Sequence, residues 1–172
     1  MDWRHSAACR DEEPELFFPI GNTGPALQQI DDARFCTAAY LHVEVDDPVS
    51  GRVRVLASSA GHPRPYLVRA SGAVERIECS GTLLGVVAAP ELVDAEVVLE
   101  AGDAVVLYTD GVTEARQGDE LFGERRLRDA LGDLAGETAA GIAGGLEAAV
   151  TAFRRSARDD TAILVVAAVG SA

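Results

Sequence analysis

The spacing of hydrophobic residues from position 34 onward first follows the period of a β-strand. In RFCTAAYLHVEVD (residues 34–46), apolar or small residues occupy roughly every second position, as in a strand with one buried face. The turn DPVSG separates this segment from RVRVLASSAG, so the two segments predict a β-hairpin. PYLVRA and AVERIE flank Ser71-Gly72 and predict another hairpin, and AEVVLE and AVVLYTD add two strands. This part of the chain therefore predicts antiparallel β-structure.

Beyond residue 120 the hydrophobic period becomes helical. The segment LFGERRLRDALGDL has leucines at approximately helical spacing, namely Leu121, Leu127, Leu131 and Leu134. The segment ETAAGIAGGLEAAVTAFRR carries one apolar stripe, formed by Ile142, Leu146, Ala149, Val150 and Phe153. The glycines of this second helix either weaken it or allow another element to pack closely against it; they are Gly141, Gly144 and Gly145.

The last apolar segment, DDTAILVVAAV, is a nearly continuous hydrophobic run. Such runs are typical of strands buried on both faces, so we expect this strand at the centre of a sheet. Strands, then two helices, then a central strand indicate an α+β fold built in layers. With 172 residues, 48% of them hydrophobic, the chain can form a domain with its own core. Residues 1–33 show neither period, and we expect them to be poorly ordered.

Charge and cysteine content restrict the function classes. The net charge of −13 argues against binding to nucleic acid, which needs clustered basic side chains. No apolar run approaches the roughly 20 residues that span a bilayer, and the N-terminus has no apolar signal core. We therefore expect a cytoplasmic protein without membrane contact. Cys9, Cys36 and Cys79 are too widely spaced for a disulfide framework or a self-contained zinc site.

Carboxylates occur at the ends of two very apolar strands. Asp110 follows AVVLYT and is followed at once by Gly111, while Asp159 and Asp160 precede TAILVVAAV. If these strands are neighbours, the carboxylates converge at one rim, where their repulsion favours a hard divalent cation. Gly111 would let the backbone turn past a metal or phosphate without a Cβ in the way. The alternative is that Asp110-Gly111 is only a turn and Asp159-Asp160 only a solvated strand entry.

Three other residues are candidates for supporting roles. His62 lies in the connection ASSAGHPRPYLV and is a candidate contact for substrate or phosphate, although a lone loop histidine is more often structural or exposed. Thr109 offers a hydroxyl at the strand end beside Asp110, and Glu114 is a candidate acid near the metal ligands.

Six segments between residue 34 and the C-terminus occur in a recognisable order: RFCTAAYLHVE, ASSAGHPRPYLVR, GTLLGV, GDAVVLYTDGVTEAR, LFGERRL and RDDTAILVV. In this order and spacing they resemble the PPM-type, metal-dependent serine/threonine phosphatases, in the branch of stage II sporulation protein E and the sigma-factor regulatory phosphatases. The resemblance implies an αββα sandwich of antiparallel sheets flanked by helices. It also implies a site for two Mg²⁺ or Mn²⁺ ions, which activate a bridging water that attacks the phosphorus of a phosphoserine or phosphothreonine.

The same resemblance implies roles for individual residues. Asp110 and Asp159 match metal-binding aspartates of the family, and Asp160 and Gly111 match their supporting neighbours, with Thr109 beside them. His62 matches a histidine typical of this branch. The implied substrate is a phosphorylated protein of the anti-anti-sigma type in a partner-switching circuit.

Two motifs expected at the start of the family domain are missing ahead of residue 34. The family domain begins with a strand carrying Gly-Asp, followed by an acidic segment with Gly-His-Gly, and neither occurs before residue 34. The resemblance therefore implies a partial sandwich that lacks the N-terminal strands, with half of the metal site absent.

Residues 1–33 resemble the start of a different family, the WhiB-like iron–sulfur regulators. That family binds a four-iron four-sulfur cluster through four cysteines, of which Cys9 matches the first. The following CxxC does not occur, and RFCT around Cys36 fits the phosphatase strand better. We therefore expect a WhiB-like remnant over 1–33 and a partial phosphatase domain over 34–172.

Three functional hypotheses follow. The first is a metal-dependent protein serine/threonine phosphatase, inactive if the missing ligand motifs are essential. The second is a non-catalytic truncated or fused chain that acts at most as a phosphoprotein-binding module. The third is a WhiB-like regulator fragment, which the net charge and the small number of cysteines disfavour.

Overall fold

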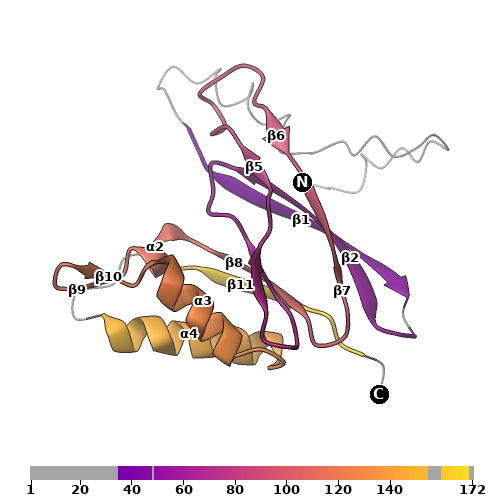
Figure 1. The fold of residues 1–172 in the computed structure, drawn as a ribbon. Coiled ribbons are helices and arrows are strands. Elements are labelled where there is room, and N and C mark those ends of the chain that lie inside the picture. The colour runs from indigo at the N-terminus through magenta and orange to yellow at the C-terminus, as the bar shows by residue number, and fades with distance from the viewer. Residues whose placement is uncertain (1–34, 48, 155–159, 171–172) are drawn as a thin grey trace, which may run out of the picture.

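The computed structural model of the protein describes residues 35–47, 49–154 and 160–170. The predictions for residues 1–33, including poor order and a role for Cys9, fall outside the described residues, and so does the metal-ligand prediction for Asp159. Within the described part, the fold is α+β, with antiparallel sheets stacked on each other and helices on one side (Figure 1). The predicted fold class is confirmed.

The first sheet is three-stranded, in the order β1-β2-β7. It contains β1 (Ala38–Asp47), β2 (Arg52–Ala60) and β7 (Ala95–Leu99). The predicted hairpin between β1 and β2 forms, with Val43 opposite Val55 and Leu41 opposite Ala57. Alternate residues of these strands point toward the second sheet, as the period of two requires.

The second sheet is four-stranded, in the order β11-β8-β3-β4. It contains β3 (Tyr66–Val68), β4 (Val74–Arg76), β8 (Ala104–Tyr108) and β11 (Ile163–Ala167). The predicted hairpin of β3 and β4 forms here, and the turn after β7 carries the chain from the first sheet into the second. Two short hairpins complete the strands: β5 (Ser80–Gly81) with β6 (Leu92–Val93), and β9 (Arg116–Gln117) with β10 (Glu120–Leu121).

The position predicted for the last strand is wrong. β11 lies at the edge of its sheet, whereas the central strands β8 and β3 are buried along their whole length. Leu164 of β11 is 59% exposed. The apolar run misled the prediction because both strands are almost purely hydrophobic, and composition cannot tell a central strand from an edge strand.

Helices α3 (Gly123–Asp133) and α4 (Ala139–Phe153) cover the outer face of the four-stranded sheet, and a short helix α2 (Asp110–Thr113) follows β8. Both long helices were predicted, with one correction. Leu121 lies in β10 and is exposed, whereas the neighbouring Phe122 is buried at the start of α3. Thr138 caps α4 by accepting a hydrogen bond from the Gly141 N–H at 3.1 Å.

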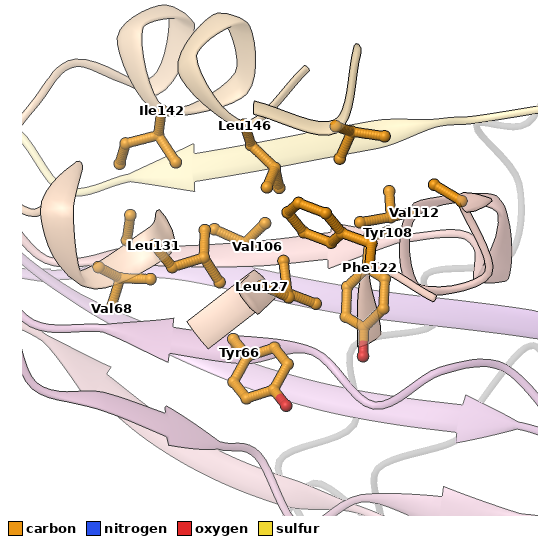
Figure 2. Close-up of a cluster of buried hydrophobic side chains, with 13 residues drawn as sticks. Tyr66, Val68, Val106, Tyr108, Val112, Phe122, Leu127, Leu131, Ile142 and Leu146 are labelled. Atoms are coloured by element: carbon orange, nitrogen blue, oxygen red, sulfur yellow. The ribbon is translucent and has the colours of Figure 1, made fainter. Parts of the chain in front are cut away.

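Two hydrophobic cores hold the layers together. The core between the helices and the four-stranded sheet contains Tyr66, Val106, Leu127, Leu131, Ile142 and Leu146 among its buried members (Figure 2). The core between the two sheets contains Val55, Ala57, Leu67, Val105 and Leu107. Alternate residues of β8 enter opposite cores, so this strand contributes to both.

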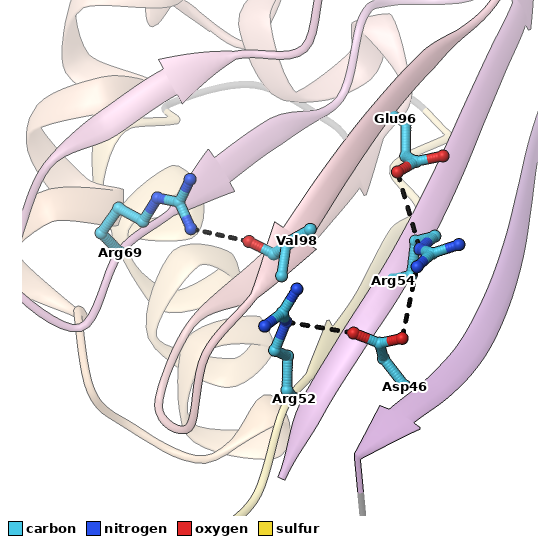
Figure 3. Close-up of polar contacts among 6 residues, drawn as sticks. All are labelled: Asp46, Arg52, Arg54, Arg69, Glu96 and Val98. Carbon is cyan, nitrogen blue, oxygen red and sulfur yellow. Dashed lines mark hydrogen bonds and ion pairs between the residues drawn. The ribbon is translucent and has the colours of Figure 1, made fainter. Parts of the chain in front are cut away.

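Charged side chains join the strands of the first sheet. Asp46 pairs with Arg52 at 3.1 Å and with Arg54 at 3.2 Å, and Arg54 approaches Glu96 at 3.6 Å (Figure 3). These pairs are partly exposed, so each contributes about 0–1 kcal/mol. Arg69 has a different role, because it donates to the Val98 carbonyl at 2.8 Å and thereby ties the end of β3 to β7. None of the helices in the described residues could cross a membrane.

Candidate functional site

The candidate site begins where β8 runs into α2. Thr109 has an extended backbone, and the chain enters the short helix at Asp110. Asp110 is exposed, whereas the next two residues, Gly111 and Val112, are buried. The hydroxyl of Thr113 and the N–H of Glu114 both donate to the Asp110 carbonyl, at 3.1 and 2.8 Å. The strand is therefore core, and its end presents one carboxylate to solvent.

The antiparallel pairing of β8 and β11 brings Asp160 to the same rim. Ile163 lies opposite Tyr108, so the residues just before β11 meet those just after β8. Thr109 makes three hydrogen bonds to the segment before β11. Its N–H donates to the Ala162 carbonyl at 3.0 Å, its hydroxyl accepts from the Ala162 N–H at 2.9 Å, and the same hydroxyl contacts the Asp160 carbonyl at 3.2 Å.

The structure shows why a glycine is needed at position 111, while its predicted role in a turn past a metal or phosphate stays a prediction. Its backbone is helical, and it needs no left-handed conformation. A Cβ at this position would lie 2.5 Å from the Asp160 carbonyl oxygen and 3.2 Å from the Thr161 hydroxyl. Only glycine leaves room here for the backbone of Asp160. The Asp110 and Asp160 segments can therefore touch backbone to backbone.

Sequence reasoning missed two residues at this junction, Arg154 and Thr161. One guanidinium nitrogen of Arg154 donates to the Gly111 carbonyl at 2.6 Å and to the Thr161 hydroxyl at 2.5 Å. Thr161 was recognisable as the residue following the acidic pair. Arg154 carried no signal, because an arginine near the end of a predicted helix is usually a solvated side chain.

An open cleft of about 580 Å³ adjoins this rim. It runs between α4 and the segment entering β11, and its polar lining residues include Glu147, Thr151, Arg154, Asp160 and Thr161.

His62 lies at the same end of the sandwich, in the connection between β2 and β3. Because β3 pairs antiparallel with β8, with Tyr66 opposite Val106, the connection that precedes β3 lies toward the end of β8. Its ring Nδ1 is 3.4 Å from the Thr37 hydroxyl, and its carbonyl accepts a hydrogen bond from the Ser59 hydroxyl at 2.7 Å. Its predicted role in substrate contact stays a prediction.

The two cysteines of the described chain lie in different settings. Cys36 is exposed, and Cys79 is buried in the core between the sheets. Burial raises the pKa of the Cys79 thiol, so it remains protonated at neutral pH.

The oxygen donors at the rim are of the type that hard divalent cations prefer. Asp110 and Asp160 supply carboxylate oxygens, which Mg²⁺ and Mn²⁺ prefer, and both residues are exposed. Within the described ranges, no group of three or more His, Cys, Asp or Glu residues gathers at a single point. Mg²⁺ commonly keeps several waters and uses one or two carboxylates. The metal-binding roles predicted for these residues stay predictions.

Comparison with known proteins gives two similarities along the chain. Residues 21–169 match the family described as Stage II sporulation protein E (SpoIIE). Over 34 residues, the chain is 76% identical to the transcriptional regulator WhiB1 of Mycobacterium tuberculosis (strain ATCC 25618 / H37Rv), which covers 20% of this chain and 40% of that protein. The predicted resemblance to both families is confirmed, while the predicted boundary after residue 33 stays a prediction.

Solved structures agree with the fold. The phosphatase domain of SpoIIE from Bacillus subtilis superposes with a TM-score of 0.62 at 18% identity, covering 80% of this chain and 58% of that domain. The RsbU and RsbW domains of Rv1364c from Mycobacterium tuberculosis give a TM-score of 0.61 at 25% identity, covering 81% and 38%. The chain thus spans less than two thirds of each of these relatives. Because the family match covers 21–169 and includes both acidic segments, the chain belongs to the Stage II sporulation protein E (SpoIIE) family.

Proposed function

We propose that this chain carries part of the active site of a metal-dependent protein serine/threonine phosphatase. One observation supports the proposal above the others: Thr109 and Gly111 hold the Asp110 turn against the Asp160 segment, so that both acidic segments share one rim. The proposed substrate is a phosphorylated serine or threonine protein of a sigma-factor partner-switching circuit. The solved relatives with SpoIIE and RsbU domains support this assignment.

The proposed residue roles follow the family resemblance. Asp110 and Asp159 would hold Mg²⁺ or Mn²⁺, Asp160 would support them, and Thr109 and Gly111 would fix their spacing. When bound, the metals would supply a water activated for attack on phosphorus. The chain's own contribution is to hold carboxylates at one rim beside an open cleft, with His62 proposed as a substrate contact at the same end.

A second candidate function is a phosphoprotein-binding module without turnover. Two observations favour it: the described residues gather no group of three or more metal-ligating side chains, and the chain covers 58% of the SpoIIE phosphatase domain. Such a module would keep the cleft and the hairpins around it but would bind metal weakly.

A third candidate, a WhiB-like regulator fragment, is favoured only by the 76% identity over 34 residues. It predicts that iron–sulfur reconstitution of the chain gives an absorbance band near about 400 nm, the region expected for clusters bound by cysteine. Lack of such a band after reconstitution would remove this candidate.

The decisive experiment is hydrolysis of a phosphoserine peptide by the purified chain with Mn²⁺ and with a chelator. The variants are Asp110→Asn and, as a control, Asp129→Asn, an exposed aspartate on α3. Phosphatase activity predicts phosphate release that requires Mn²⁺, is lost in Asp110→Asn and is unchanged in Asp129→Asn. Equal rates for the chain and Asp110→Asn would reject catalysis at this rim. Peptide binding without turnover would then favour the second candidate.

A further inference from the structure

Arg154 occupies a fixed position at the end of α4. It is the C-cap residue of the helix, and its N–H donates to the Val150 carbonyl at 3.0 Å. The residue before it, Phe153, packs edge to face against Phe122, with ring centroids 5.6 Å apart. Val150 is buried in the core between helices and sheet. The backbone that carries Arg154 is therefore held by core packing on the helix side.

The guanidinium of Arg154 reaches from this anchor to both acidic segments. The Gly111 carbonyl, 2.6 Å away, belongs to a four-residue helix, whose carbonyls have few partners within the helix itself. The Thr161 hydroxyl, 2.5 Å away, directly follows Asp160. The same hydroxyl lies 3.5 Å from the Gly111 carbonyl. One cationic group thus closes a small network that includes the residue after Asp110, a candidate metal ligand, and the residue after Asp160, its proposed support.

Such a network has more effect than an exposed ion pair. Hydrogen bonds from a charged donor are stronger than neutral ones, and partial burial protects them from competition with water. Arg154 and Thr161 are both partly buried. Thr109 already joins the two segments, but its contacts are to Ala162 and Asp160. Arg154 acts on the other side of the junction, on the α2 backbone directly after Asp110.

We infer that Arg154 is a positioning residue, which works with Thr161 to hold the Asp110 turn against the Asp160 segment and so couples the acidic rim to α4. The inference rests on the proposed function only in that the rim is taken to bind a divalent cation. In this inference, α4 does more than cover the sheet. Through Arg154 it also fixes the spacing of the two acidic segments before any metal binds. Arg154 itself touches neither metal nor substrate in this assignment.

The test compares Arg154→Met and Thr161→Val with the unmodified chain and with Arg125→Met. Arg125 is an exposed arginine on α3 and serves as the matched control. The first measurement is amide hydrogen exchange by NMR without metal, at the N–H groups of Val112 and Glu114, which are bonded to the carbonyls of Thr109 and Asp110. The second is Mn²⁺ affinity by calorimetry.

We expect exchange at Val112 and Glu114 to become about tenfold faster in Arg154→Met and Thr161→Val, the size set by loss of one charged hydrogen bond. Exchange in the central strand β8, at Val106, should not change. Mn²⁺ affinity should fall severalfold in both variants, and Arg125→Met should match the unmodified chain in both measurements. Unchanged exchange and unchanged Mn²⁺ affinity in a folded Arg154→Met variant would overturn the inference.

The two measurements separate this inference from the proposed function. If the unmodified chain binds no Mn²⁺, the metal-dependent function fails, while faster exchange in Arg154→Met still supports the positioning role. If Arg154→Met does not fold, Thr161→Val decides, because it removes only the hydroxyl between guanidinium and carbonyl. If the Val112 and Glu114 amides exchange as slowly in Thr161→Val as in the unmodified chain, the inference is contradicted.

Discussion

A methyl group on Gly111 would lie 2.5 Å from the carbonyl oxygen of Asp160. This approach is closer than any Cβ tolerates, and it joins two segments that are distant in the sequence but flank the same pair of strands. The contact fixes how far apart the Asp110 and Asp160 backbones can lie. Because both carboxylates are exposed, the contact shapes the rim without burying charge.

We therefore expect Gly111→Ala to lower the free energy of unfolding by about 1–3 kcal/mol, the usual cost of forcing extra volume into a packed site. The neighbour is backbone, so it cannot rotate away as a side chain could. Urea unfolding of the variant measures the loss. A cost below about 0.5 kcal/mol, the range of an ordinary surface substitution, would show that the two segments are not held together as described.

The buried carboxylate of Asp103 gives a prediction for pH. Asp103 is 4% exposed and accepts hydrogen bonds from Arg69 at 2.8 Å, the Ala70 N–H at 2.9 Å and the Glu100 N–H at 3.1 Å. Burial alone would raise the pKa of this carboxyl, but the Ala70 N–H, the Arg69 guanidinium and the Glu100 N–H together hold the pKa below its ordinary value. The carboxylate therefore stabilises the folded state above its unfolded pKa of about 4, and this contribution is lost as pH falls through the folded pKa.

Asp103→Asn should accordingly cost about 1.5–3 kcal/mol at pH 7, where the charged hydrogen bonds are intact. Below pH of about 4 the cost should shrink, because Asp103 becomes protonated in the unmodified chain and its stabilising contribution is lost. Urea unfolding at neutral and acidic pH measures both values, with the exposed Asp119→Asn as control. A cost that is the same at both pH values would contradict the pKa direction.

Two adjacent glycines of α4 should respond oppositely to the same substitution. A Cβ at Gly144 would meet nothing within 4 Å, whereas one at Gly145 would lie 2.4 Å from a methyl group of Leu134. Gly144→Ala should stabilise the protein by about 0.5–1 kcal/mol through helix propensity. Gly145→Ala gains the same propensity but must displace Leu134, so thermal unfolding should place it at least about 1 kcal/mol below Gly144→Ala. Equal stabilities would mean that α3 and α4 do not pack closely at this point.

The sequence predicted most of the elements because their periods are strong. The β1–β2 hairpin, the β3–β4 hairpin and the stripe of Ile142, Leu146 and Val150 on α4 all form as expected. The role of the α4 glycines could not be decided, since it depends on Leu134, the C-cap residue of α3. Leu121 was misassigned because Phe122, one residue later, fills the buried position at the start of α3.

The candidate site was predictable only in its acidic residues. Asp110, Asp159 and Asp160 were predicted because carboxylates beside very apolar strands are conspicuous. The antiparallel pairing of β8 and β11 does bring the segments of Asp110 and Asp160 together, while the metal-binding roles stay predictions. Arg154 was not predictable, since its importance comes from a carbonyl of α2 that lies far away in the sequence. Residues whose function is a tertiary hydrogen bond leave no local pattern.

The edge position of β11 allows a prediction with an internal control. Leu107 of β8 and Leu164 of β11 face each other in register and have the same side chain, but Leu107 is 8% exposed and Leu164 is 59% exposed. Leu107→Ala should lower the free energy of unfolding by about 2–5 kcal/mol, because it opens a cavity in the core between the sheets. Leu164→Ala should cost less than about 1 kcal/mol, since water already reaches that side chain. Urea unfolding of both variants measures the difference. A large cost for Leu164→Ala, comparable to that of Leu107→Ala, would mean that another part of the protein or a second chain covers the β11 edge in solution, and measuring the cost at several protein concentrations would distinguish these two sources.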